Sequence, residues 1–303
     1  MELSELHYLV CVFLSLSGIT TDVILLALLG TMKKRLLKRP TNKYLFSLIL
    51  SDLLNAIAYL GCEINSLKNK SVMDESLDAF MKIQLPLIGF RLTSLILSLD
   101  NLIALTVDRL VAIKWPLFYD RFATPKHVTM IIVAAWSVGA AWLCSWVTLL
   151  KFDIAASYHM ASITIIAQIV SGIFVLGFSN MYVYLEARKQ IRKIARFSVG
   201  KKEHVALRRS LEQEVRAAKI CFGLTFCFIF IWLPSLVNEA YRYASQMIIV
   251  LQVVSSIALQ LTSIVDPLLY ALLNKEFRRE FRKLIKGKRQ ATNTSITILR
   301  SSK

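Results

Sequence analysis

Long runs of apolar residues recur along the chain, separated by short polar stretches. Each run has about 20 residues or more, enough for an α-helix to cross a hydrocarbon core about 30 Å thick. The pattern predicts seven membrane-spanning helices, at about residues 7–31, 44–64, 82–108, 128–149, 158–186, 217–238 and 247–272. We therefore expect an all-α, seven-transmembrane helix bundle that fills nearly the whole chain.

The segment after the last apolar run has a different periodicity. Phe277, Phe281, Leu284 and Ile285 recur at i, i+4, i+7 and i+8 in an otherwise basic sequence. This is the pattern of an amphipathic helix that lies in contact with lipid at a membrane surface, here over residues 274–286. The sequence thus predicts one membrane domain over residues 1–286 and a short, basic, disordered tail over 287–303.

Charge along the chain indicates which side of the membrane each loop faces. The net charge is +17, and most of the 37 Lys and Arg lie after the first, third, fifth and seventh expected spans. Because basic loops stay in the cytoplasm, the N-terminus is expected outside the cell and the C-terminus inside. The basic excess is thereby explained by topology and does not predict nucleic-acid binding.

Two smaller features bear on the same topology. Asn69 begins a glycosylation sequon in a loop expected outside, whereas the sequon at Asn293 lies in the tail and is expected to stay unmodified. The five cysteines all lie in or beside apolar runs. We expect them to be small buried hydrophobes, with no disulfide between the outer loops.

Charged residues interrupt several apolar runs, among them Asp22, Asp52, Arg91 and Asp266. Such residues are costly inside a membrane, face the interior of the bundle, and usually mark function. One alone could serve helix packing, but a set at matching depths in several helices favours a functional role.

Two groups of polar residues can be expected inside the bundle. Asp52, Ser98, Ser263 and Asp266 are placed to converge near mid-membrane in a small pocket of oxygen ligands, which would suit a sodium ion at Asp52. At the cytoplasmic mouth, Arg109 can pair with its neighbour Asp108, and Glu214 at the start of span six is a candidate second carboxylate.

Five motifs in the same order resemble those of the rhodopsin-like (class A) G-protein-coupled receptors, over about residues 7–286. They are Asp52 in span two, Asp108-Arg109-Leu110 after span three, Trp136 in span four, Phe228 with Trp232-Leu233-Pro234 in span six, and Asp266-Pro267-x-x-Tyr270 in span seven.

The resemblance implies a multi-pass plasma-membrane receptor that binds an extracellular ligand and activates a heterotrimeric G protein. Span six would swing outward about Pro234, next to a toggle formed by Phe228 and Trp232. In the family's pattern Pro267 belongs to the switch, and Arg109 and Tyr270 would line the opened cytoplasmic cleft. Leu117 would insert into the G protein.

Several positions depart from the family pattern. Gly172 and Asn180 stand where a proline and a tyrosine are common, and Gln84 stands where the disulfide cysteine normally lies, so that bridge is expected to be absent. The missing fifth-helix proline, a short second outer loop at about 150–157 and the span-seven aspartate, Asp266, resemble the melanocortin, lysophospholipid, cannabinoid and adenosine group. Asp22 replaces the usual asparagine of the first helix.

Asp22 adds a third carboxylate to the expected Asp52–Asp266 site. Three neighbouring carboxylates cannot all ionise cheaply, so at least one is expected to be protonated at rest, with signalling sensitive to pH or sodium. Alternatively, one neutral aspartic acid simply mimics asparagine.

Arg91 lies about five helical turns outward of Arg109, on the face that lines the ligand cavity in this family. A positive charge there disfavours a monoamine ligand. Arg91 either binds a carboxylate or phosphate of the ligand or pairs internally with Glu63 or Glu239; Gln260 is a further candidate ligand residue. Retinal is excluded as a ligand because no lysine lies between Met247 and Tyr270.

Two other classes fit the sequence less well. A transporter or ion channel using the intramembrane carboxylates would be expected to show paired repeats, and none is found. An enzyme would need a set of catalytic or metal-binding side chains that converges within the spans, and the histidines lie at or near loops instead. We expect no catalytic site, and no cofactor or metal beyond a sodium ion.

Overall fold

The computed structural model describes residues 3–31, 40–69, 77–115, 118–119, 124–197, 222–223, 226–241, 249–273 and 279. Its long helices are α1 (Leu3–Thr31), α3 (Pro40–Asn69), α4 (Leu77–Lys114), α6 (Pro125–Phe152), α7 (Ile154–Phe197) and α9 (Ile249–Leu273). A further helix, Phe226–Tyr241, lies between α7 and α9 in the sequence. Each of the seven predicted spans overlaps one of these helices, which confirms the all-α, seven-helix bundle.

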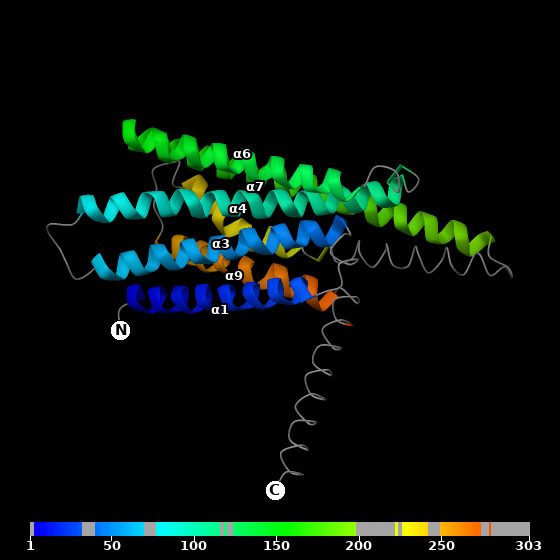
Figure 1. Cartoon of the computed structure of the whole chain (residues 1–303), viewed down its shortest axis with the longest axis horizontal. Helices are drawn as coiled ribbons and strands as arrows, with labels where there is room; N and C mark the ends of the chain where they lie inside the picture. Colours follow the sequence, from blue (N-terminus) through cyan, green and yellow to red (C-terminus); the bar gives the residue numbers. More distant parts are fainter. Residues whose placement is uncertain are drawn as a thin grey trace, which may run out of the picture.

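The helices lie side by side along the long axis of the molecule (Figure 1). In that view α1 and α6 lie on opposite sides of the bundle, with α3 and α4 between them. α4 packs against α3, α6 and α7, while α3 also packs against α1 and α9. The two central helices are therefore placed to bring interior residues from most of the others together.

Five of the helices contain their predicted spans and extend beyond them, as α4 and α7 show. α4 begins at Leu77 and continues to Lys114, beyond the expected 82–108, and α7 extends to Phe197. The reason is that apolar runs mark only the part of a helix that lies in hydrocarbon, whereas backbone hydrogen bonding continues into the polar region. The predicted interfacial helix at 274–286 and the tail at 287–303 lie outside the described residues, apart from helical Arg279.

The turn between α6 and α7 is much tighter than the loop expected at 150–157. Asp153 alone is non-helical, and its amide donates to the carbonyl oxygen of Leu149 (2.8 Å), which ends α6. Its carboxylate accepts from the amide of Ala156 (2.9 Å) in the first turn of α7. One aspartate thus caps two helices, a contribution that propensity alone does not reveal.

Burial in the bundle is the reverse of that in a soluble protein. Asp22 and Asp52 are fully buried, whereas Val138 on α6 and Phe178 on α7 are 66% and 77% exposed. Such an arrangement suits a bundle whose outer surface meets lipid and whose polar groups face inward.

Within the described part of the chain, four helices are long and apolar enough to cross a membrane: Leu6–Gly30, Asn42–Lys68, Pro125–Phe152 and Ala156–Glu186. Phe226–Tyr241 and Ile249–Val265 are shorter apolar helices. α4 carries the charged residues Arg91, Asp100 and Asp108 within its apolar sequence.

Small residues allow α4 to approach its neighbours closely. At Gly89 a Cβ atom would overlap the indole of Trp146, a fully buried residue of α6. At Gly172 of α7 a Cβ atom would lie 3.0 Å from the side chain of Leu99. Gly172, which departs from the proline common in the family, therefore accommodates a side chain of α4.

Candidate functional site

Polar side chains meet inside the bundle at three levels. We call the end where α1, α4 and α7 begin the N-terminal end, and the end where α4 and α7 finish the opposite end. A charged group lies near the N-terminal end, a group of aspartates, asparagine and serine lies in the middle, and a cavity lies toward the opposite end.

Arg91 of α4 is the centre of the charged group. Its guanidinium carbon lies 4.4 Å from the ring centre of Tyr59 on α3, a cation–π arrangement. Glu63 of α3 and Glu239 of the helix Phe226–Tyr241 both act electrostatically on Arg91, and both glutamates are buried. Neither the Nε atom of Arg91 nor the Oε2 atom of Glu63 has a hydrogen-bond partner among the described residues. The structure thus brings together three of the four predicted ligand-binding residues.

Hydrogen bonds fix the neighbours of this group. Ser162 Oγ of α7 donates to Glu239 Oε2 (2.9 Å), and the Tyr59 hydroxyl donates to the carbonyl oxygen of Ser256 on α9 (3.3 Å). The fourth predicted residue, Gln260, accepts from Ser15 Oγ of α1 (3.3 Å). Ser162 was not predicted, because a lone serine in an apolar run carries no signal of its own.

In the middle of the bundle, α1, α3 and α9 meet around Ser263. Its hydroxyl donates to the carbonyl oxygen of Asp52 (3.2 Å) and accepts from Asn55 Nδ2 (3.4 Å). The Cβ atom of Ser263 lies 3.2 Å from the position a Cβ would take at Gly18 of α1. Asn55 is three residues after Asp52 on the same helix face, which is the signal that could have identified it.

The structure describes the side chains of only some members of the predicted carboxylate cluster. Asp22, Asp52, Ser98 and Ser263 are all buried on their helices. Asp266 lies in α9, but its side chain is outside the described part of the structure. A shared site of three carboxylates, with or without sodium, stays a prediction.

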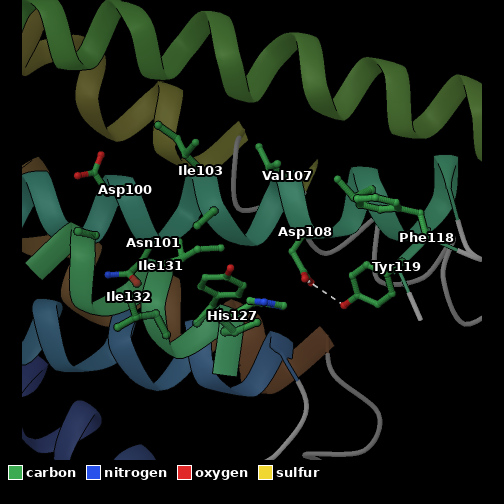
Figure 2. Close-up of a pocket in the computed structure, with 15 residues that line it drawn as sticks. Asp100, Asn101, Ile103, Val107, Asp108, Phe118, Tyr119, His127, Ile131 and Ile132 are labelled. Atoms are coloured by element: carbon green, nitrogen blue, oxygen red, sulfur yellow. Dashed lines mark hydrogen bonds between the residues drawn. The ribbon is translucent and has the colours of Figure 1, made fainter. Parts of the chain in front are cut away.

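A cavity of about 450 Å³ lies between α3, α4 and α6 toward the opposite end (Figure 2). The Tyr119 hydroxyl donates to Asp108 Oδ1 across a distance of 3.0 Å, shown as the dashed line in Figure 2. Tyr44 of α3, Asn101 of α4 and His127 of α6 also line the cavity. Tyr119 was missed by the sequence argument, because only the fold brings it to Asp108.

Several predicted switch residues cannot be placed. Arg109 lies in α4, and Pro267 and Tyr270 lie in α9, but their side chains are outside the described set. Leu117 and Glu214 fall outside the described residues altogether. Their proposed roles are therefore not tested by geometry.

The predicted toggle residues do lie together. The rings of Phe228 and Trp232 have centres 5.2 Å apart and an interplanar angle of 31°, and both side chains are buried. They belong to a core cluster that includes Leu95 and Leu99 of α4. Pro234 lies two residues further along the same helix. Any movement of this helix must therefore rearrange its packing against α4.

Polar contacts elsewhere explain two positions singled out in the sequence. Trp136 of α6 donates from Nε1 to Ser47 Oγ of α3 (2.9 Å). Gln84 of α4 accepts from Asn65 Nδ2 of α3 (2.9 Å), so a hydrogen bond joins these helices where the family normally has a disulfide cysteine.

The cysteines differ partly from expectation. The four that the structure describes are free, and Cys11 and Cys62 are buried as predicted. Cys144, however, is exposed on α6, and Cys227 is partly buried. A thiol tolerates contact with lipid as well as a small apolar side chain does. A cysteine in an apolar run therefore need not be buried inside the protein.

Comparison with known proteins decides the family. The model of the 7 transmembrane receptor (rhodopsin family) matches residues 23–270. The chain belongs to this family. It is 24% identical to human melanocortin receptor 3 over 305 residues, which cover 91% of this chain and 84% of that protein. It is 23% identical to human adenosine receptor A2a over 218 residues, covering 63% of this chain and 52% of the relative.

A third relative, melanopsin-A of Gadus morhua, is 22% identical over 300 residues, covering 90% of this chain and 52% of that protein. Family and relatives together confirm a G-protein-coupled receptor, a multi-pass protein of the plasma membrane. They lend no support to a transporter, and the family is one of receptors and not of enzymes. The likeness to melanocortin and adenosine receptors agrees with the resemblance seen in the sequence.

Proposed function

We propose that this receptor binds an acidic extracellular ligand at Arg91 and transmits binding to a heterotrimeric G protein at the opposite end of the bundle. In this proposal the N-terminal end faces outward and the C-terminus lies in the cytoplasm, as the distribution of basic residues favours. The observation that carries the proposal is the interior guanidinium of Arg91, held over Tyr59 with its Nε atom unpaired among the described residues.

The chemistry of arginine supports an anionic ligand. A guanidinium offers donors in a planar fork that matches the two oxygens of a carboxylate or phosphate. A buried donor without a partner costs free energy, and a ligand oxygen would remove that cost. A monoamine would instead meet a like charge. The ring of Tyr59 contacts one face of the guanidinium, so a ligand would bind at its donor edge.

Glu63 and Glu239 give the competing interpretation. Both carboxylates lie within electrostatic reach of Arg91 and could neutralise it without any ligand. However, no direct hydrogen bond satisfies Arg91 Nε or Glu63 Oε2 among the described residues. An incompletely satisfied internal group is more readily reorganised by a ligand than a closed ion pair.

Transmission would pass through the helix Phe226–Tyr241. Glu239 lies two turns beyond Trp232 on this helix, so one helix links the charged group to the Phe228–Trp232 stack. A ligand that draws Arg91 away from Glu239 would change the forces on this helix. The ligand can shift the equilibrium between the inactive and active states only by the difference in its affinity for these two states.

The test is the response of the Arg91→Ala receptor in cells that carry G-protein biosensors, challenged with acidic lipids, acidic peptides and nucleotides. Loss of a charge-assisted contact is expected to lower the potency of an acidic agonist about 10- to 100-fold. Lys82→Ala is the matched control, because Lys82 is an exposed basic residue of the same helix. Unchanged potency at normal surface expression would show that Arg91 pairs internally.

A separate variant tests coupling. Arg109→Ala is expected to abolish basal and agonist-induced G-protein signals while ligand binding persists, because Arg109 is proposed to line the G-protein cleft. Full signalling by this variant would remove Arg109 from the proposed switch.

A further inference from the structure

Beside the Arg91 group, three potential metal ligands meet near the N-terminal end. His7 and Cys11 lie four residues apart on α1, and Glu63 comes from α3. One ligand atom from each lies within 4.8 Å of the others. None of the interactions described for the receptor switch uses His7 or Cys11.

The spacing of these atoms suits tetrahedral coordination of a metal ion. The Cys11 Sγ and His7 Nδ1 atoms are 3.5 Å apart. Zinc binds sulfur at about 2.3 Å and imidazole nitrogen at about 2.0–2.1 Å, so tetrahedral geometry places the two ligand atoms about 3.5 Å apart. The i, i+4 spacing on a helix holds both side chains on one face at this separation.

Glu63 supplies an independent indication of a ligand. The residue is only 8% exposed, and its Oε2 atom has no hydrogen-bond partner among the described residues. A buried carboxylate oxygen left unsatisfied is costly, and a metal ion would satisfy it. A carboxylate facing an imidazole and a thiol has the donor set of a zinc site.

We propose that His7, Cys11 and Glu63 bind one zinc ion, which joins α1 to α3. A thiol and an imidazole favour zinc over magnesium or calcium, which prefer oxygen ligands. Three protein ligands leave the fourth position for a water molecule, and Gln260 and Ser256 of α9 lie next to the Cys11 thiol.

The charges also fit an ion in a buried place. Cys11 would release its thiol proton to solvent on binding, so that one thiolate and one carboxylate neutralise the two positive charges of zinc. The same ion would withdraw Glu63 from Arg91, one of whose neighbouring carboxylates is then occupied. Provided that Arg91 is the ligand site proposed above, zinc is expected to increase the potency of an acidic agonist.

Metal binding is measured on the purified full chain in lipid nanodiscs, without agonist. Co²⁺ serves as the probe, because a cobalt–thiolate bond absorbs in the near ultraviolet, and Zn²⁺ should displace it at one equivalent. Cys11→Ser is expected to abolish the thiolate band, and His7→Ala to weaken Zn²⁺ binding at least tenfold. Cys144→Ser and His159→Ala are matched controls, because both residues are exposed and lie on other helices.

Thermal unfolding gives a second readout. Zn²⁺ should raise the Tm of the original chain and of Cys144→Ser, because a ligand that binds only the folded state stabilises it. It should leave the Tm of Cys11→Ser and of Glu63→Gln unchanged. Glu63→Gln keeps the shape of the side chain, so it tests the site even if the other variants fold poorly.

Absence of the cobalt band in the original chain, or its equal loss in Cys144→Ser, would overturn the zinc site. Because no agonist is present, this result is independent of whether Arg91 binds an acidic ligand. Conversely, zinc binding without any change in agonist potency would leave the metal site intact and contradict the role of Arg91.

Discussion

The absence of a side chain at Gly89 allows the indole of Trp146 to lie directly against α4. Trp146 is fully buried, stacks on Trp142 with ring centres 5.9 Å apart, and meets the edge of Tyr158 at 6.0 Å. These aromatic rings join α4, α6 and α7 in one cluster, so a single position controls the packing of three helices.

Gly89→Ala is accordingly expected to destabilise the receptor by about 1–3 kcal/mol, the usual cost of overpacking a core. The measurement is the Tm of the solubilised protein. Gly177→Ala is the control, because a Cβ there meets no atom within 4 Å, and this change should be neutral or stabilising by up to about 1 kcal/mol. Equal Tm values for the two variants would show that Trp146 can move away from the added methyl group without loss of stability.

Asp52 is the residue whose charge is expected to couple signalling to sodium. Replacing sodium in the medium by choline should change the basal G-protein signal of the original receptor and have no effect on Asp52→Asn, since the variant lacks the carboxylate. Ser51→Ala is the control: Ser51 is buried next to Asp52, but its hydroxyl donates only locally, to the carbonyl oxygen of Leu48 (2.7 Å). Equal sodium responses in all three receptors would argue against a cation at Asp52.

Among the helices, a small number of side-chain hydrogen bonds supplements apolar packing. Trp136 joins α6 to α3, Gln168 Nε2 of α7 donates to Asp100 Oδ1 of α4 (2.8 Å), and Lys43 Nζ of α3 donates to the carbonyl oxygen of Pro125 at the start of α6 (2.7 Å). Each partner comes from a distant part of the sequence. Such contacts set which helices are neighbours, beyond what hydrophobicity dictates.

The bond from Tyr119 to Asp108 is placed to influence the switch. Tyr119→Phe removes it and leaves Asp108 more available to hold Arg109, so basal G-protein signalling should fall, about two- to fivefold for a hydrogen bond of roughly 1 kcal/mol. The readout is basal biosensor signal at matched surface expression. Phe118→Leu is the control, because exposed Phe118 lines the same cavity with an apolar side chain. Raised basal signalling in Tyr119→Phe would show that the bond restrains the receptor.

The helices could be predicted from sequence because hydrocarbon imposes both their length and their apolar composition. Their ends could not, since Asp153 stops α6 and starts α7 through its own backbone and carboxylate contacts. Resemblance to the family identified the Phe228–Trp232 pair. It could not identify Ser162 or Tyr119, whose partners depend on how helices are rotated against each other. The His7–Cys11 spacing was visible in the sequence, but only the fold brings Glu63 beside it.

Across the whole molecule, the buried aspartates and the exposed aromatic residues both require a surrounding membrane. Phe174 and Phe178 on α7 are among the most exposed large apolar side chains, whereas Asp22 and Asp52 have no exposed surface. This arrangement fixes which surfaces meet lipid, but it is the same for either orientation across the bilayer. Orientation must therefore be tested separately.

Glycosylation distinguishes the two orientations. Asn69 ends α3 at the N-terminal end of the bundle, and its sequon is expected to be glycosylated when the receptor is made in animal cells. Asn69→Gln should then abolish the change in gel mobility that a glycosidase produces. Asn293→Gln is the control, because that sequon is expected on the cytoplasmic side. Loss of the glycan in Asn293→Gln instead would reverse the proposed topology.

The hydrogen bond between Asn65 and Gln84 has a practical consequence for making the protein. These two amides join α3 to α4, with Gln84 at the position where the family normally has a disulfide cysteine, and the described cysteines are all free thiols. The contact between α3 and α4 at this end is therefore expected to form without a disulfide. The receptor is a good candidate for cell-free synthesis in the presence of a reducing agent, conditions that would also keep the Cys11 thiol intact.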